Sequence, residues 1–139
     1  MEEEVRIVID TTWWISMILS KQSTGLPEVL LNSKYRICFS KELMEEVFHT
    51  LSYPTKQKRI NDTNLAIYGS FINSSVLFID VKTTVKICRD PNDDFLLALS
   101  KDAGAKFLIT DDPDLLVLKK FETTTIISFI DFIKKIQSK

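Results

Sequence analysis

Glycine, proline and histidine are scarce in this chain of 139 residues, which has 3 Gly, 4 Pro and 1 His. So little glycine and proline, together with 45% hydrophobic residues, argues against disorder and predicts a packed core. The length fits a single domain, residues 1–139. The single histidine, His49, argues against histidine-based zinc or general-base chemistry. The absence of a glycine-rich phosphate loop weakens the case for a nucleotide-binding fold.

The chain also lacks an excess of charge, because 18 basic and 19 acidic residues give a net charge of -1. It is therefore not a strongly basic nucleic-acid protein, although a local basic groove remains compatible with this balance. No run of 18 apolar residues occurs, since Asp10 interrupts the N-terminal apolar region, and no membrane span is expected. The acidic start, Met1–Glu4, is unlike a signal peptide. The 2 cysteines, Cys38 and Cys88, have no metal-type spacing and predict buried free thiols in a reducing cytoplasm.

Hydrophobic patterning predicts strands that alternate with helices. Strands are expected at residues 5–9, 35–39, 76–79, 106–109 and 123–127, and a short extended piece at 85–88. Helices are expected at residues 12–19, 27–33, 41–51, 61–73 and 91–103, after 113 and after 128. This alternation predicts an α/β fold with a mostly parallel central sheet flanked by helices.

Aspartates cluster at both ends of the stretch 89–116. Asp90 and Asp112 each precede a proline, which predicts a helix N-cap followed by proline at the first helical position. Gly104 fits the residue that ends the intervening helix. Acidic side chains are thus expected at a helix start and at a strand end, where parallel α/β folds build sites.

Four carboxylates are expected near strand ends or the first turns of the following helices: Asp10, Glu46, Asp93 and Asp112. If the strands at 5–9 and 106–109 are parallel neighbours, Asp10 and Asp112 emerge at the same edge of the sheet. Converging carboxylates repel one another, and a hard cation such as Mg²⁺ or Mn²⁺ is the natural counter-charge. One or two such ions can activate water and stabilise an in-line displacement at phosphorus.

Four segments, in order and nearly end to end, resemble the PIN domain family, and within it the branch of toxin–antitoxin toxins. They are V-I-D-T at 8–11, S-K-E-L-M-E-E-V at 40–47, C-R-D-P-N-D-D-F-L-L-A-L at 88–99 and I-T-D-D-P-D-L-L at 109–116. The resemblance implies a three-layer α/β/α sandwich and Mg²⁺- or Mn²⁺-dependent cleavage of RNA. The family's acidic and supporting positions correspond to Asp10, Glu46, Asp93, Asp112, Asp114 and the hydroxyl residue Thr110.

The chain departs from the family pattern beside these positions. Thr12 stands where the family usually has Asn, a residue that helps to orient the first carboxylate. Trp13 and Trp14 stand where small aliphatic residues are usual. They could stack on unpaired bases, but core packing of at least one ring is the favoured interpretation. Asp111 replaces a small residue that is commonly Gly and adds charge beside the site.

Each candidate also has a structural alternative. Asp112 can cap its helix and still bind a metal, whereas for Asp90 capping alone is favoured. Asp93 can be a solvated first-turn acid, and Asp94 competes with it for the ligand role. Glu46 can belong to a solvated acidic helix face.

The basic segment Lys56, Lys58 and Arg59 can contact a phosphate backbone, or it can be an ordinary solvated surface. The favoured function is a cytoplasmic metal-dependent ribonuclease. The resemblance implies an antitoxin partner and a homodimer, neither of which the sequence itself shows. One alternative is a catalytically weak PIN-like protein that binds RNA or a partner. Another is a metal-dependent phosphatase or a nuclease acting on DNA.

Overall fold

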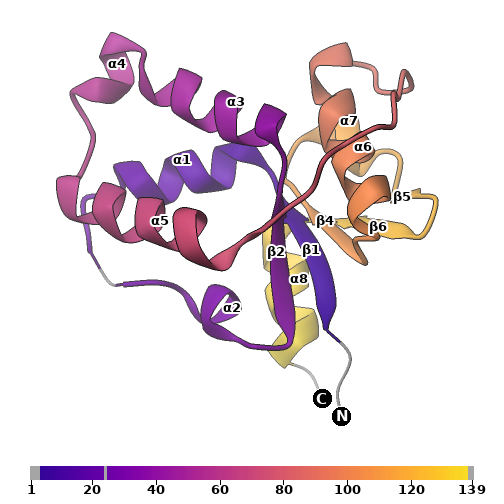
Figure 1. Cartoon of the computed structure of the whole chain (residues 1–139), viewed down its shortest axis with the longest axis horizontal. Helices are drawn as coiled ribbons and strands as arrows, with labels where there is room; N and C mark the ends of the chain where they lie inside the picture. The colour runs from indigo at the N-terminus through magenta and orange to yellow at the C-terminus, as the bar shows by residue number, and fades with distance from the viewer. Residues whose placement is uncertain (1–3, 24, 138–139) are drawn as a thin grey trace.

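The protein is built on one six-stranded sheet, seen in a computed structural model that describes residues 4–23 and 25–137 (Figure 1). The strand order is β3-β2-β1-β4-β6-β5, and every neighbouring pair is parallel except β5 with β6. The strands are β1 (Val5–Ile9), β2 (Tyr35–Phe39), β3 (Leu77–Phe78), β4 (Phe107–Ile109), β5 (Lys120–Phe121) and β6 (Thr124–Ile127). The prediction of a mostly parallel sheet is confirmed.

Helices cover both faces of this sheet. They are α1 (Thr11–Leu19), α2 (Glu28–Leu31), α3 (Lys41–Leu51), α4 (Pro54–Gln57), α5 (Asp62–Ser75), α6 (Asp94–Ala103), α7 (Pro113–Leu116) and α8 (Phe129–Gln137), with a 3-10 turn η1 (Pro91–Asp93). Figure 1 shows α8 passing behind β1 and β2, whereas α6 lies near β4 and β6. Within the described residues, none of these helices has the length and apolar character needed to span a membrane.

The alternation of side chains along the strands explains the three layers. Ile7 and Phe107 are register partners, and the Phe107 ring packs edge-on against Phe132 of α8 at 5.4 Å. Arg6 points to the opposite face, where its Nη1 donates to the carbonyl of Ala103 on α6 at 3.0 Å. The three-layer α/β/α sandwich that the resemblance implied is therefore present.

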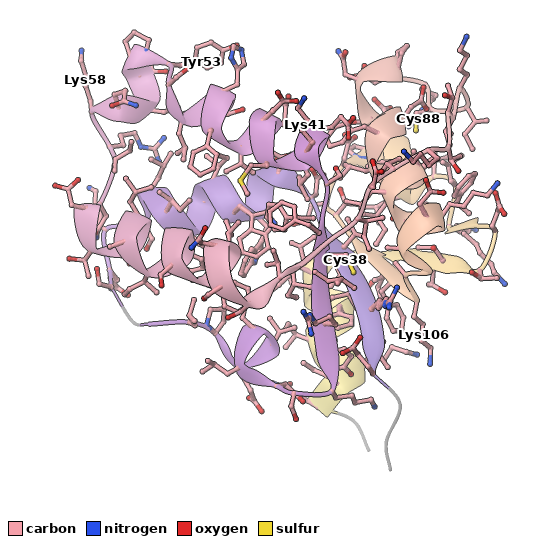
Figure 2. The ribbon with its side chains drawn as sticks, in the orientation of Figure 1. Cys38, Lys41, Tyr53, Lys58, Cys88 and Lys106 are labelled. Atoms are coloured by element: carbon pink, nitrogen blue, oxygen red, sulfur yellow. The ribbon has the colours of Figure 1, made fainter. Side chains whose placement is uncertain are left out.

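The core confirms the interpretation of one tryptophan. Trp14 is 0% exposed, its Nε1–H donates to the Ile9 carbonyl at 3.1 Å, and its ring stacks on Phe71. Cys38 on β2 is a buried free thiol, and burial raises the pKa of that thiol to about 11 (Figure 2). Cys88 is also free but only partly buried, so the prediction of two buried thiols holds fully for Cys38 alone.

The aspartate caps are present where the sequence predicted them. Asp90 accepts a hydrogen bond from the Asn92 backbone N–H at 3.0 Å. Asp112 accepts one from the Asp114 backbone N–H at 2.9 Å. Gly104 ends α6 in the left-handed conformation with φ of 64°, which glycine adopts without a Cβ penalty.

The sequence missed three local features. The turn after Asp90 is 3-10, so α6 begins only at Asp94. Pro54 ends α3 as expected but then occupies the first position of a new short helix, α4. The β5–β6 hairpin uses positive φ values at Lys119 and Glu122, where no glycine signals a turn. The expected extended piece at residues 85–88 does not join the sheet. Residues 1–3 of the acidic N-terminal segment lie outside the described residues.

Candidate active site

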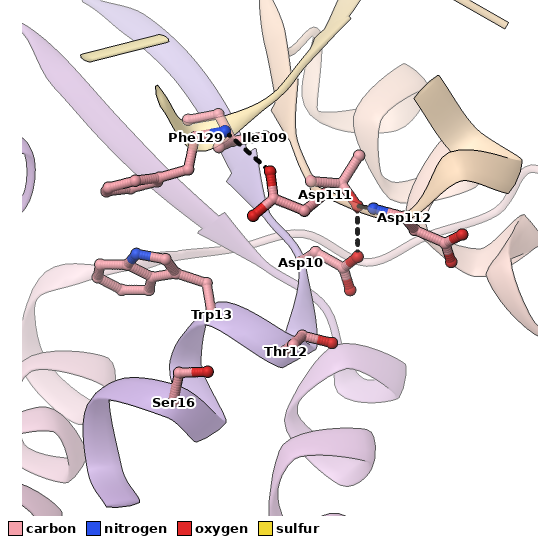
Figure 3. Close-up of a pocket in the computed structure, with 9 residues that line it drawn as sticks. Asp10, Thr12, Trp13, Ser16, Ile109, Asp111, Asp112 and Phe129 are labelled. Carbon is pink, nitrogen blue, oxygen red and sulfur yellow. Dashed lines mark hydrogen bonds between the residues drawn. The ribbon is translucent and has the colours of Figure 1, made fainter. Parts of the chain in front are cut away.

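The site begins where β1 and β4 end side by side. The Asp10 backbone N–H donates to the Ile109 carbonyl at 3.0 Å, which extends the parallel ladder by one residue. The next residue on the β4 side, Thr110, then lies beside Asp10, and its Oγ1 donates to Asp10 Oδ2 at 2.6 Å (Figure 3). The predicted meeting of these two strand ends is therefore observed.

One hydroxyl orients two acidic residues. Thr110 is 3% exposed, and its Oγ1 also accepts the backbone N–H of Asp112 at 3.0 Å. Burial raises the pKa of Asp10, and the nearby Asp112 charge raises it further, whereas the Thr110 hydrogen bond opposes the shift. The strand ends thus hold two carboxylates close together, in a setting that disfavours the negative charge of Asp10.

The turn η1 brings a third carboxylate to this pair. Burial raises the pKa of Asp93 to about 7, and the neighbouring Asp112 carboxylate adds to the shift. Asp93 Oδ2 is buried and has no hydrogen-bond donor among the described residues. An unpaired buried oxygen is costly, so this atom needs a proton or a cation.

Asp90, Asp93 and Asp114 also form a compact group. Each offers one carboxylate oxygen, and the three oxygens lie within 4.8 Å of one another. The Arg89 guanidinium flanks the group, since its Nη2 contacts Asp114 Oδ1 at 2.9 Å and the Pro113 carbonyl at 3.2 Å. Asp90 is the cap that the sequence favoured, and one of its oxygens also lies in this group.

Asp94 lies one residue along but serves a different purpose. Its Oδ1 accepts the backbone N–H groups of Ile87 at 3.2 Å and Cys88 at 2.9 Å. Asp94 thus anchors the preceding segment, while Asp93 faces the acidic cluster. Asp93 is the last residue of the 3-10 turn and Asp94 the first of α6, and successive residues of a helical turn point in different directions.

A cavity of about 410 Å³ gathers four of the predicted acids, together with two basic residues and Thr12 of α1. The acids come from four different segments: Asp10, Glu46, Asp93 and Asp112. Lys56 and Arg59, from α4 and the turn after it, line the same cavity and bring positive charge near the acids. Lys58 does not line it, and Figure 2 shows this residue at the outer end of α4.

A family model described as PIN domain matches residues 6–114, most of the chain. The chain belongs to the PIN domain family. No curated protein and no solved structure matches it. PIN domains have a nuclease-type fold, and they are generally metal-dependent nucleases that act on RNA. The matched span ends at Asp114 and includes every candidate acid described above.

The residues of this PIN domain fit a divalent cation. The available donors are carboxylate oxygens, which are the ligands that hard cations prefer. Asp93 Oδ2 has no hydrogen-bond partner among the described residues, and the raised pKa values of Asp10 and Asp93 show that a nearby positive charge would favour their ionised forms. A divalent ion would remove the repulsion and satisfy the buried oxygen.

Sequence reasoning missed two contributors. Arg89 lies in the motif at 88–99, and its position just before the Asp90 cap places a cation beside an expected acidic site. Phe129 was not considered, and it reaches the site because α8 begins two residues after β6 ends at the same sheet edge. The adjacency of a strand end and a helix start was the available signal for Phe129.

Proposed function

We propose that this PIN domain is a ribonuclease that hydrolyses phosphodiester bonds with Mg²⁺ or Mn²⁺ as cofactor. The observation that carries the proposal is the buried Asp93 Oδ2 beside Asp112, which has no hydrogen-bond donor in the part of the chain that the structure describes. Thr110 holds the neighbouring Asp10 carboxylate and the Asp112 backbone. A divalent ion bound here would act as a Lewis acid, which would lower the pKa of water and stabilise negative charge on the phosphoryl oxygens.

The protein side chains divide the remaining work. Asp10, Asp93 and Asp112 hold the metal, with Asp114 as an additional acid at the edge of the cluster. Thr110 is a positioning residue, because its hydroxyl fixes the Asp10 carboxylate and the Asp112 backbone together. Glu46 is exposed on α3 and lines the same cavity, where it holds an ion or accepts a proton from water.

The RNA backbone crosses the cavity between the acids and α4. Lys56 and Arg59 bind phosphates flanking the cleaved bond, because they line the acidic cavity and oppose its charge. Lys58 lies outside the cavity and contributes only longer-range attraction. The overall charge of -1 means that this local arrangement, rather than net charge, attracts RNA.

The biological role that we propose is that of a cytoplasmic toxin restrained by an antitoxin. The four motif segments support this role, and an antitoxin segment would cover the acidic cavity. A homodimer is part of the same proposal. Leu31 and Phe48 support it as exposed apolar side chains, 66% and 47% exposed, in the first half of the chain.

The second candidate function is RNA or partner binding without efficient cleavage. Thr12 supports it, because a short hydroxyl side chain stands in the acidic cavity where the family usually has an amide. This candidate predicts metal and RNA binding with little turnover.

Calorimetry with Mn²⁺, followed by RNA cleavage on the same samples, tests the proposal. Wild type is expected to bind Mn²⁺ and cut RNA, while Asp10→Asn and Asp112→Asn lose both activities and stay folded. Asp80→Asn is the matched control, since Asp80 is 84% exposed and pairs with Lys82 at 2.8 Å. Absence of divalent-ion binding at millimolar concentration would overturn the proposal. RNA binding without cleavage would establish the second candidate, and preference for single-stranded DNA or a small phosphoester would change the substrate class.

A further inference from the structure

A second cavity, of about 340 Å³, lies against the acidic cluster (Figure 3). Its apolar wall consists of Trp13, Ile109 and Phe129, and Asp111 stands opposite the hydroxyl residues of α1. Asp10, Asp112, Thr12 and Ser16 line both this cavity and the acidic one, so the two spaces are adjacent. The volume lies at the lower end of small-ligand sites, which span roughly 300–1,000 Å³.

The aromatic wall is held firmly from behind. Trp13 is partly buried, and its ring meets Trp14 edge-on at 5.0 Å and Tyr68 edge-on at 6.2 Å. The Phe129 ring lies 5.4 Å from Trp13 with an interplanar angle of 31°. Figure 3 shows these two rings together at one side of the cavity. Such fixed aromatic groups bind planar partners at a low cost in conformational entropy.

The polar wall accepts hydrogen bonds. Asp111 is exposed, and its Oδ1 accepts the Phe129 backbone N–H at a long 3.4 Å. This long contact uses one lone pair of one oxygen, so both carboxylate oxygens can still accept a hydrogen bond from a ligand. Ser16 and Thr12 add hydroxyl groups from α1. A planar ligand with N–H donors on one edge fits this cavity, because its face can pack on Trp13 and Phe129 while its edge donates to Asp111.

Charge decides which part of an RNA can enter. Asp10, Asp111 and Asp112 line this cavity, and no Lys or Arg of the described chain does. A phosphate is therefore repelled here and drawn instead toward Lys56 and Arg59 in the neighbouring space. An uncharged nucleobase is not repelled by these carboxylates. The residues shared by the two cavities would place such a base next to the phosphate in the acidic cavity.

We propose that this cavity is a nucleobase subsite, in which one unpaired base of the RNA packs against Trp13 and Phe129 and donates hydrogen bonds to Asp111. This inference rests on the proposed ribonuclease function, because it places the base beside the cleaved phosphate. Guanine is the preferred base, since its N1–H and N2–H groups offer two adjacent donors to one carboxylate. Uracil offers a single N–H between two carbonyl oxygens, which the carboxylate repels.

Tryptophan fluorescence tests the subsite without requiring cleavage. Trp14 is fully buried and serves as an internal reference, whereas Trp13 lines the cavity. In EDTA, a uridine oligonucleotide with one central guanosine should quench the fluorescence and bind roughly fivefold or more tightly than the all-uridine oligonucleotide. Trp13→Phe should remove the quench, and Asp111→Asn should remove the guanosine preference. Asp80→Asn is the charge-matched control, and thermal unfolding checks that each variant folds.

The outcomes separate the subsite from the catalytic proposal. Guanosine-dependent quenching in a protein that cleaves nothing would support the subsite and reject the ribonuclease. Cleavage with equal rates for all base compositions in wild type, Trp13→Phe and Asp111→Asn would reject the subsite and retain the ribonuclease. Quenching by arginine amide, but by neither oligonucleotide, would overturn the subsite and identify the cavity as a pocket for a cationic side chain of a protein partner.

Discussion

Two groups of aspartates in this PIN domain differ in what their surroundings do to their charge. Asp102 lies on α6, and its carboxylate accepts hydrogen bonds from the backbone N–H groups of Lys82 and Thr83 and from the Thr83 hydroxyl. These hydrogen bonds hold the pKa of Asp102 below its usual range. In the acidic cluster, burial raises the pKa values of Asp10 and Asp93 instead. The fold supplies Asp102 with three hydrogen-bond donors, whereas Asp93 Oδ2 has no hydrogen-bond partner among the described residues.

Asp94 shows how close the two groups lie in sequence. Partial burial pushes the pKa of Asp94 upward, but the N–H groups of Cys88 and Ile87 outweigh it and lower the pKa. Its neighbour Asp93 has the opposite shift. Hydrogen-bond donors thus stabilise the charge of Asp94, whereas Asp93 has one buried oxygen with no donor among the described residues, which leaves that oxygen free to bind a ligand.

Apart from the proposed metal ligands themselves, the largest effect is expected at Thr110, which contacts both Asp10 and Asp112. Thr110→Val keeps the side-chain shape but removes the donor to Asp10 and the acceptor for the Asp112 N–H. Metal affinity and RNA cleavage should fall by about 10- to 100-fold, as for other residues that orient metal ligands. Mn²⁺ calorimetry and cleavage rates measure this change.

Thr124→Val is the matched control for that variant. Thr124 is 1% exposed and its hydroxyl donates to the Ala105 carbonyl at 2.7 Å, so its removal also costs one buried hydrogen bond. Equal losses of metal affinity in the two variants would show that Thr110 matters only for stability.

Removing a satisfied carboxylate should weaken the fold. Asp102→Ala leaves two backbone N–H groups and one hydroxyl without their acceptor, and the free energy of unfolding should fall by about 1–2 kcal/mol, a figure kept low because the site is solvated. Because the pKa of Asp102 is lowered on folding, its contribution is present above its unfolded value and is lost as pH falls through the folded one. Urea unfolding at neutral and acidic pH measures both effects, and an unchanged Mn²⁺ affinity is expected.

The sequence predicted the part of the site at the ends of β1 and β4 better than the part at the start of α6. Asp10 and Thr110 were placed correctly because apolar strand patterns fix where parallel strands end, and neighbouring strands then align these residues. The grouping of Asp90 with Asp114 depends on the 3-10 turn and on Arg89, which no periodicity encodes. The sequence also left open whether Asp93 or Asp94 faces the acidic cluster, because the backbone N–H groups that engage Asp94 come from a segment without regular structure.

Neutralising an unsatisfied carboxylate should stabilise the metal-free protein. Folding raises the pKa of Asp93 to about 7, so the folded protein binds a proton on this carboxyl more tightly than the unfolded chain does. The stability that this proton contributes is present below the pKa of the unfolded chain and is lost as the pH rises through about 7. Asp93→Asn should therefore raise the melting temperature in EDTA, and the gain should grow with pH up to about pH 8. Asp94→Asn, one residue away, should lower it. A destabilised Asp93→Asn protein at about pH 8 would contradict the contrast between the two groups.

The smallest change in stability and in metal affinity is expected at Arg89, which contacts Asp114 at the exposed edge of the acidic group. Its ion pair with Asp114 joins side chains that are 60% and 37% exposed, so Arg89→Gln should change the free energy of unfolding by less than about 1 kcal/mol. Its guanidinium, however, supplies positive charge to the group formed by Asp90, Asp93 and Asp114, and it competes there with a divalent ion. Arg89→Gln should therefore tighten Mn²⁺ binding slightly at low ionic strength, and added salt should reduce the difference. Weaker binding in this variant would mean that Arg89 orients Asp114 for the ion rather than competing with it.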